Sequence, residues 1–505
     1  MLLLAQSLLF LQACDNNFDE INTDPDAVSK PSPRFVFSKA IYDGVRFSGN
    51  TSTLLLGAMQ YTTSYNDVAG FGSKYVHGSG FSPSPTVFSS AYPNQINEIG
   101  EVIKVVKDDP SQVNLYAVAR IWRVFCFSRL TDLYGDIPYS QAGLGYTESL
   151  FQPAYDTQES IYADMLKELD EATQSLDASN NNTFGSSDLI YGGNTDQWKK
   201  FGFSLMLRLG MRLTEVNAGS AETWVKKAIA GGVITAYDDI AKVSYVGSGQ
   251  KINNNPLAQG MLDSDYIFAD GNKNPEGGKY QQVFIDSLKA NNDPRLSVIS
   301  VVYVDGVADD TPALQKGMLA TINGIKPADF GTYSEPKQST ILRLAAPMLI
   351  FTAAETYFLL AEAAVRNWYT LEPASALYEK GIRAAMQQWD LISGTTGTIT
   401  EDQINDYVAS HSLTATTEEG QKEQIYTQFW ISIFPDAQEV FNHYRRTGYP
   451  ALTPNNYPGN LTNSQIFKRF LYPVSEQNLN TASYNAAVAR QGADDFLTPI
   501  WWDKN

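Results

Sequence analysis

The sequence predicts a mainly α-helical fold, and two patterns support this expectation. Apolar residues recur at steps of three and four through much of 35–230 and 345–450, which places them on one face of a helix. In 231–345 Gly, Asn, Asp and Pro interrupt short apolar runs, and a similar irregularity returns in 451–505. We therefore expect one domain over 35–505, in which helical repeats carry a loop-rich, partly β insert and an irregular C-terminal segment.

Each expected element follows from a local pattern. Asp156 and Glu159 have the spacing of a capping box, in which each side chain bonds a backbone N–H of the first helical turn. The β-branched run 298–304 is typical of a strand. In chain order, the expected helices cover 95–106, 113–130, 156–176, 195–213, 280–290, 352–368, 373–389 and 418–445.

One pair of these helices resembles a tetratricopeptide repeat. Small residues stand where two such helices would cross, at Ala361, Ala374 and Gly381, and the aromatic Tyr378 follows Ala374 by four positions. An ordinary antiparallel helix pair with alanine at its close crossing is the alternative.

The composition excludes several classes of protein. The 505 residues include 55 acidic and 37 basic side chains, which give a formal net charge of −18. Hydrophobic residues make up 43% of the chain. That balance argues against disorder, against nucleic-acid binding and against electrostatic docking on an anionic membrane. Three histidines, two cysteines and the absence of HExxH and CxxC motifs make a zinc hydrolase a poor interpretation.

The N-terminus reads as a secretion and anchoring signal. Residues 1–13 form an apolar run that is too short to span a bilayer and fits the apolar region of a signal peptide. The run ends at Leu11-Gln12-Ala13-Cys14, which resembles a bacterial lipobox, so we expect Cys14 to carry the lipid. Residues 14–34 then form a tether rich in Asn, Asp, Pro and Ser. The alternative is a buried apolar helix.

Catalytic motifs are weak. Cys126 lies in an apolar stretch, which is typical of an inert buried thiol. Asp132 and Asp136 flank a turn and resemble the two catalytic carboxyl residues of a glycosidase, whose carboxyl groups stand roughly 5–10 Å apart. Capping and turn hydrogen bonds explain the same two residues more simply.

Aromatic residues in loops are the remaining candidates for binding. Sugars present flat C–H faces that stack on aromatic rings, with hydroxyl groups at the rim. The segment 61–81 interleaves Tyr65, Phe71 and Tyr75 with Asp67 and has little helical period, and Tyr266 lies in a similar setting. We expect these five residues to contact a ligand, although each ring could instead belong to the core.

A calcium site is a further expectation from spacing alone. Asp263, Asp265 and Asp270 offer carboxylate oxygens, the ligand type that Ca²⁺ prefers. No metal or cofactor is otherwise expected.

Ordered motifs along nearly the whole chain resemble the SusD/RagB family, the surface nutrient-binding lipoproteins of the Bacteroidetes outer membrane. Each motif is short, but their order is specific. In sequence they are FDEINTDP (18–25), TDLYGDIPY (131–139), YDTQ (155–158), YGG (191–193), WKKF (198–201), NDPRL (292–296), AEA (361–363), YRRTGYP (444–450), YPVSE (472–476) and WWD (501–503).

The resemblance implies about four tetratricopeptide-like helix pairs, with the irregular segments carrying much of the binding surface. It also implies a lipid-anchored protein at the cell surface that binds cargo without cleaving it and sits as a lid over a SusC-like, TonB-dependent outer-membrane transporter. The usual cargo of the family is oligosaccharide, and peptide in some members. Binding residues vary between members, so none is transferred by position.

We therefore expect an outer-membrane lipoprotein that captures polysaccharide fragments and delivers them to its transporter. Two alternatives belong to other classes. A glycoside hydrolase on a helical scaffold would release reducing ends from a polysaccharide, and a peptide- or protein-binding repeat scaffold would need no aromatic-rich exposed loops.

Overall fold

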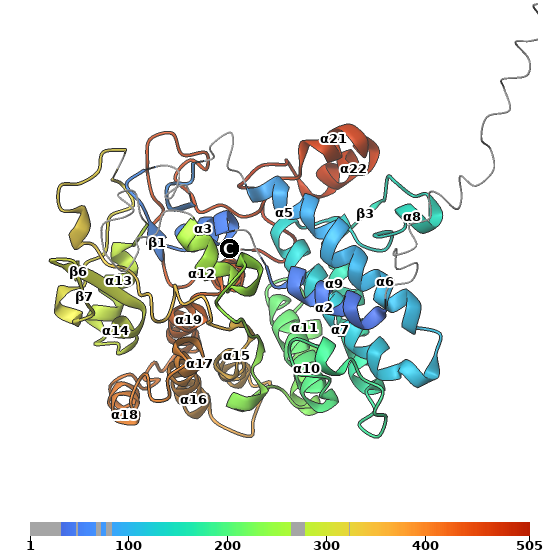
Figure 1. Ribbon diagram of the computed structural model, residues 1–505, viewed down its shortest axis with the longest axis horizontal. Coiled ribbons are helices and arrows are strands. Elements are labelled where there is room, and N and C mark those ends of the chain that lie inside the picture. The colour runs from blue at the N-terminus through green and yellow to red at the C-terminus, as the bar shows by residue number, and fades with distance from the viewer. Residues whose placement is uncertain are drawn as a thin grey trace, which may run out of the picture.

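The computed structural model describes residues 32–46, 49–66, 72–76, 83–263, 278–322 and 324–504. Helices dominate it, in agreement with the prediction (Figure 1). A first group follows the chain from residue 33 to residue 231. Its members are α2 (Pro33–Gly44), α3 (Gly49–Ala58), α5 (Pro83–Ala91), α6 (Asn97–Val106), α7 (Val113–Tyr134), α8 (Gly145–Glu148), α9 (Gln158–Ser175), α10 (Thr195–Arg212) and α11 (Ala218–Gly231).

Helix α7 is the centre of this first group. It packs on α6 and α9, and α10 packs in turn on α9 and α11. Residues on all sides of α7 are buried, as expected of a helix that neighbours surround. Helix α9 corrects the capping prediction, because its N-cap is Thr157, whose hydroxyl accepts from the amide of Ser160. Asp156 instead lies in a short strand and accepts from the amides of Tyr139 and Ser140.

Most of a second group of helices lies at the lower left of the view in Figure 1. Helix pair α15 and α16 matches the predicted pair, and a Cβ on Gly381 would stand 2.9 Å from the ring of Phe358. The predicted helix over 418–445 is interrupted at Pro435, which has no N–H to donate to a helix. The group comprises α15 (Ala353–Val365), α16 (Ala374–Gln387), α17 (Trp389–Ser393), α18 (Glu401–Ser410), α19 (Glu418–Ile433) and α20 (Ala437–Thr447).

The segment between the two groups is loop-rich and partly β, as predicted. Its described residues form three short helices, α12 (Pro256–Asp263), α13 (Gln282–Ala290) and α14 (Arg295–Ile299). Strand β6 is the middle of a three-stranded antiparallel sheet, between β7 and β8. The other strands pair antiparallel as β1 with β5, β2 with β3 and β4 with β9.

All described strands are short. They are β1 (Thr62–Thr63), β2 (Ile137–Pro138), β3 (Tyr155–Asp156), β4 (Ala241–Val243), β5 (Lys279–Tyr280), β6 (Ser300–Val304), β7 (Val307–Asp309), β8 (Glu335–Pro336) and β9 (Met348–Phe351). A π-helical segment, η1 (Tyr92–Ile96), joins α5 to α6. The 3-10 turns are η2 (Pro110–Gln112), η3 (Gly185–Ser187), η4 (Tyr237–Asp239), η5 (Lys251–Asn253), η6 (Pro312–Leu314) and η7 (Phe330–Thr332).

The C-terminal segment is irregular except for two helices that the sequence did not predict, α21 (Val474–Leu479) and α22 (Thr481–Gln491). The chain then returns to the core, where Trp502 is fully buried and its indole N–H donates to Asp132 over 3.0 Å. One continuous cluster of buried apolar side chains extends from Phe37 to Trp502. Among the helices that the structure describes, none combines the length and the apolar character needed to cross a bilayer.

Candidate ligand-binding cleft

Two of the predicted binding residues are in the interior. The ring of Tyr65 is 8% exposed and packs edge-to-face on Phe330, with ring centres 5.2 Å apart. Tyr75 is 5% exposed, and burial raises the pKa of its hydroxyl. The sequence suggested that both rings would be exposed platforms for stacking. Because both are buried, neither is such a platform. Ligand contact through them stays a prediction.

The remaining predicted site residues mostly lie outside the described residues. These are Cys14, Asp67, Phe71 and Tyr266, and also Asp265 and Asp270 of the calcium hypothesis. Its third member, Asp263, forms an ion pair of 2.8 Å with Lys251. Within the described ranges, no group of three His, Cys, Asp or Glu side chains is placed to hold a metal ion.

The two carboxylates that most resembled a glycosidase pair have structural partners. Asp132 is 2% exposed and accepts from the Tyr162 hydroxyl, the Trp502 indole and the Asn442 amide. Asp136 is 5% exposed and accepts from the backbone amide of Gln158 over 2.9 Å. Asp136 therefore caps the start of α9, as the capping interpretation suggested, whereas Asp132 is bound by tertiary side-chain partners instead of turn hydrogen bonds.

A cleft of about 490 Å³ is lined by Met318, which packs in one cluster with Tyr65, and by Gln60, whose side chain interacts with Tyr75. We call it cleft A and define it by three of its walls, residues 281–286 of α13 and the turn before it, residues 318–321, and residues 453–456. Gln60 and Ser73 complete its lining. The volume falls in the range of 300–1,000 Å³ that small-ligand sites usually occupy.

Amide side chains fix the backbone around cleft A. Gln281 donates from Nε2 to the carbonyl oxygens of Gly57 and Thr62, both over 2.8 Å, and thereby ties α13 to the end of α3 and to β1. Gln60 adopts a left-handed backbone conformation, with φ of 64°, and its Nε2 donates over 2.6 Å to the carbonyl of Thr453. Because these amides bridge separate segments, the walls of the cleft are preorganised.

Asn455 leaves one hydrogen-bonding atom without a partner in this cleft. Its Nδ2 donates to the carbonyl oxygens of Ser73 and Ala320, each over 3.0 Å. The side chain is 8% exposed, and its Oδ1 is buried without a donor among the described residues. A buried acceptor of this kind costs free energy unless a donor reaches it. Asn455 is one of the residues that line cleft A, beside which a ligand hydroxyl or amide would bind.

The exposed lining of cleft A mixes hydrogen-bonding and aliphatic groups. Gln282, Asp286 and Asn456 are exposed polar side chains. Val283 and Leu319 are 40% and 52% exposed. Such a surface can hydrogen-bond the rim of a polyhydroxylated ligand and cover its C–H groups.

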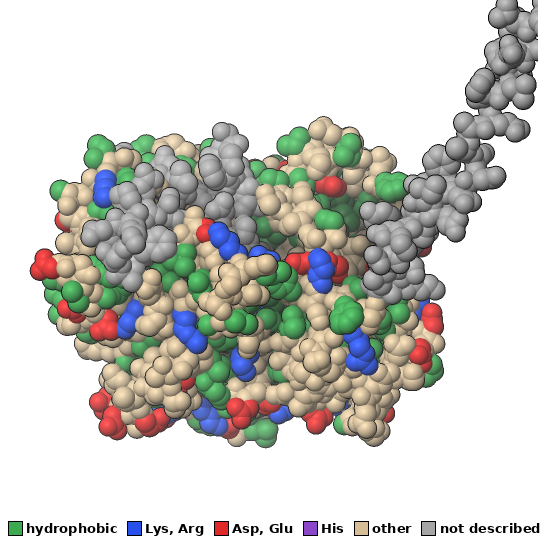
Figure 2. Space-filling model, viewed as in Figure 1, with side chains coloured by type: hydrophobic (Ala, Val, Ile, Leu, Met, Phe, Trp, Pro, Cys, Tyr) green, Lys and Arg blue, Asp and Glu red, His purple; other side chains and the backbone are tan. Residues whose placement is uncertain are grey.

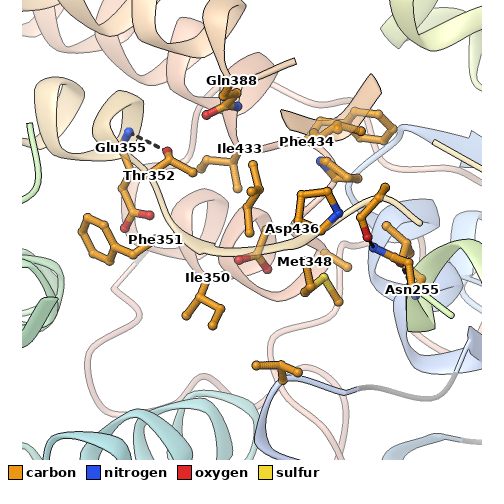
Figure 3. Close-up of a pocket in the computed structure, with 18 of the residues that line it drawn as sticks. Asn255, Met348, Ile350, Phe351, Thr352, Glu355, Gln388, Ile433, Phe434 and Asp436 are labelled. Atoms are coloured by element: carbon orange, nitrogen blue, oxygen red, sulfur yellow. Dashed lines mark hydrogen bonds between the residues drawn. The ribbon is translucent and has the colours of Figure 1, made fainter. Parts of the chain in front are cut away.

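A second cavity, near the middle of the molecule, is a weaker candidate. It measures about 80 Å³, and apolar side chains of β9 and of the end of α19 surround much of it (Figure 3). Its carboxylate Glu355 is already bound by Arg208 through two hydrogen bonds of 2.6 Å. The space is too small for a disaccharide, so we assign no ligand to it.

Comparison with known proteins identifies the family. A SusD-like family described as "Starch-binding associating with outer membrane" matches residues 25–473. The chain belongs to this SusD-like family. The resemblance seen in the sequence is therefore confirmed. A search of curated proteins finds no match.

Solved SusD-like structures share the fold over most of this chain. A chitin-binding protein is 29% identical, with a TM-score of 0.81, and a SusD-like protein from Bacteroidetes AC2a is 27% identical, with a TM-score of 0.82. A SusD homologue from Bacteroides uniformis is 26% identical, with a TM-score of 0.73. Each comparison covers 94% of this chain and 100% of the other.

Sequence reasoning did not find cleft A. Its residues come from segments near positions 60, 282, 320 and 455, and none of these segments carries a recognisable motif. The one sequence feature that could have pointed to cleft A is the Asn455-Asn456 pair in an irregular stretch. Such a pair is as typical of turns as of binding sites.

Proposed function

We propose that this SusD-like protein binds neutral oligosaccharides at the cell surface, in cleft A, without cleaving them. The observation that carries the proposal is the unpartnered, buried Oδ1 of Asn455 in a cleft of about 490 Å³. The description of the family as starch-binding and the chitin-binding relative support a glycan as the ligand class.

Charge supports a neutral rather than an anionic glycan. The chain carries a net charge of −18, and Asp286 lines the cleft. On the face shown in Figure 2, acidic and basic side chains are interspersed without a large basic patch. An acidic polysaccharide would approach this surface against electrostatic repulsion.

Titration calorimetry with soluble oligosaccharides tests the proposal. We expect the purified chain lacking residues 1–14 to bind chitin or starch oligosaccharides, with weak affinity from one shallow cleft. The variant Gln282→Ala/Asn456→Ala removes two exposed amide side chains from the lining of cleft A and should weaken binding at least tenfold. Gln250→Ala, an exposed amide outside the cleft, is the matched control and should bind like the wild type.

The same samples separate the rival functions. Release of reducing ends from either oligosaccharide would favour a glycoside hydrolase. Binding of unstructured peptides, with no response to any glycan, would favour a peptide-binding scaffold. Unchanged affinity in the double variant would remove cleft A as the site.

We further propose that Cys14 carries the lipid anchor and that bound glycan passes to a SusC-like, TonB-dependent transporter. The lipobox-like sequence supports the anchor, and the family's association with the outer membrane supports the location. Affinity purification of the full chain from outer membranes of its native host tests the partnership. The transporter should co-purify, and its absence at any salt concentration would contradict the proposal.

A further inference from the structure

A second open cleft lies at the other end of α13. Cleft B measures about 570 Å³ and is formed by the turn between α13 and α14, by residues 312–313 and by α18. On α18, Gln403, Asp406 and Ser410 follow one another at steps of three and four, so they share the face that lines the cleft. Like cleft A, cleft B mixes groups that form hydrogen bonds with apolar groups.

One exposed stripe of α13 connects the two clefts. Gln282, Asp286 and Lys289 stand at positions i, i+4 and i+7 and are all exposed, whereas Phe284 and Leu288 on the other face are buried. Gln282 and Asp286 line cleft A, and Lys289 lines cleft B. The nine residues of α13 span about 13 Å at 1.5 Å per residue, which sets the separation of the clefts.

The segment beside α13 connects the clefts in the same way. Near cleft A, the backbone N–H of Gln282 donates to the carbonyl oxygen of Met318 over 3.0 Å. Near cleft B, Lys289 donates from Nζ to the carbonyl of Gln315 over 2.8 Å. Residues 312–313 then line cleft B and residues 318–321 line cleft A. Helix α13 and the segment 312–321 therefore each contribute to the walls of both clefts.

We propose that clefts A and B are two subsites of one extended surface that binds a polysaccharide chain lying along α13. This inference rests on the proposed glycan-binding function and specifies its ligand as a chain long enough to reach both clefts. Two weak subsites joined by one ligand bind it more tightly than either alone, because the second contact is intramolecular. A disaccharide fills only one of them.

The experiment compares short and long ligands of the same chemistry by titration calorimetry. The probes are N-acetylchitobiose and N-acetylchitohexaose, with maltose and maltoheptaose as a parallel pair. We expect the wild type to bind the long member of one pair at least tenfold more tightly than the short member.

A variant confined to cleft B separates the subsites. Asp406→Ala/Ser410→Ala removes two exposed polar groups of α18. This variant should bind the short ligand with unchanged affinity. Its affinity for the long ligand should fall until it nearly equals its affinity for the short ligand. Asp402→Ala removes an exposed carboxylate of the same helix that does not line the cleft, and should bind both ligands like the wild type.

The outcomes distinguish the two proposals. Equal affinities of the wild type for short and long ligands, or wild-type affinity of the cleft B variant for the long ligand, would overturn the extended site and leave glycan binding in cleft A intact. Failure of the wild type to bind any of the four oligosaccharides would overturn the glycan-binding function itself, and the extended site with it.

Discussion

Arg446 and Glu362 form a two-pronged ion pair in the core, with N–O distances of 2.8 and 2.7 Å. The pair joins α20 to α15, and the two side chains are 3% and 1% exposed. Burial alone would raise the pKa of Glu362, but the charges of Arg446 and Arg366 more than offset it and hold that pKa at about 2. The carboxylate therefore stays ionised in the folded protein far below the usual range.

This pair predicts a loss of stability in acid. Because the folded pKa of Glu362 lies below its unfolded value of 4.5, its contribution is full above about pH 4.5 and declines as the pH falls toward 2. Glu362→Gln should lower the unfolding free energy at pH 6 by about 3 kcal/mol or more, since it leaves buried Arg446 poorly paired. The difference between wild type and variant in urea denaturation should shrink by about 2 kcal/mol between pH 6 and pH 3. A constant difference would contradict the assignment.

A second buried ion pair, between β5 and β8, predicts the opposite dependence on pH. Lys279 and Glu335 are each 1% exposed and 2.6 Å apart; burial raises the pKa of Glu335 to about 7 and lowers that of Lys279. Lys279→Met should destabilise the fold by about 3 kcal/mol, whereas Lys279→Met/Glu335→Leu should recover most of that loss.

The single variant also has a pH signature. Without Lys279, Glu335 keeps its proton in the folded state while the unfolded chain releases it above about pH 4.5, so stability should fall as the pH rises from 5 to 8. The double variant lacks the carboxyl and should not show this fall. Identical pH profiles of the two variants in chemical denaturation would contradict the prediction.

The sequence predicted the helices better than the site because helical periodicity is local. Helix α10 (Thr195–Arg212) begins at the residue that the pattern indicated. The prediction of an irregular segment between the two helix groups was also correct. Helix α22 was missed because Ala487 is its one fully buried position, so it carries no apolar stripe. Tyr65 and Tyr75 were expected to be exposed because their segment has no period, but tertiary contacts bury them.

Cleft A could not be predicted for a related reason. Its walls come from distant segments that tertiary hydrogen bonds join, such as those from Gln281 to Gly57 and from Asn455 to Ser73. These partners are separated by hundreds of residues in sequence, and polar loop residues of this kind have no periodicity that would mark one face.

Two helical glycines predict opposite effects of the same substitution. Gly381→Ala should cost about 1–3 kcal/mol of stability, because the new Cβ would stand 2.9 Å from the Phe358 ring at the crossing of α15 and α16. Gly100→Ala in α6 should stabilise the protein by about 0.5–1 kcal/mol, since nothing lies within 4 Å of that Cβ and alanine favours a helix. Urea denaturation measures both. A neutral effect at Gly381 would show that the two helices can separate without cost.

The two cysteines predict different cellular behaviour. Cys14→Ser should move the protein from the membrane fraction to the soluble fraction and abolish incorporation of labelled palmitate, because the proposed lipid anchor is attached at Cys14 and would supply the membrane affinity. Cys126 is buried in the core, so Cys126→Ala should remain with the membrane and keep the label. A Cys14→Ser protein that still sediments with membranes would contradict the anchor.

The burial of Tyr65 and Tyr75 changes what their substitution can reveal. Either residue changed to Ala should lower the unfolding free energy by about 3–5 kcal/mol, because each ring is in the interior, and any loss of glycan binding would then accompany a weakened fold. Tyr75→Phe keeps the ring and removes only the hydroxyl, which interacts with the Gln60 side chain and the Asn455 backbone. It should cost about 1 kcal/mol of stability and weaken oligosaccharide binding about threefold to tenfold, because both partners line cleft A. Wild-type stability of Tyr75→Ala would contradict its burial, and wild-type affinity of Tyr75→Phe would show that the hydroxyl does not support the cleft.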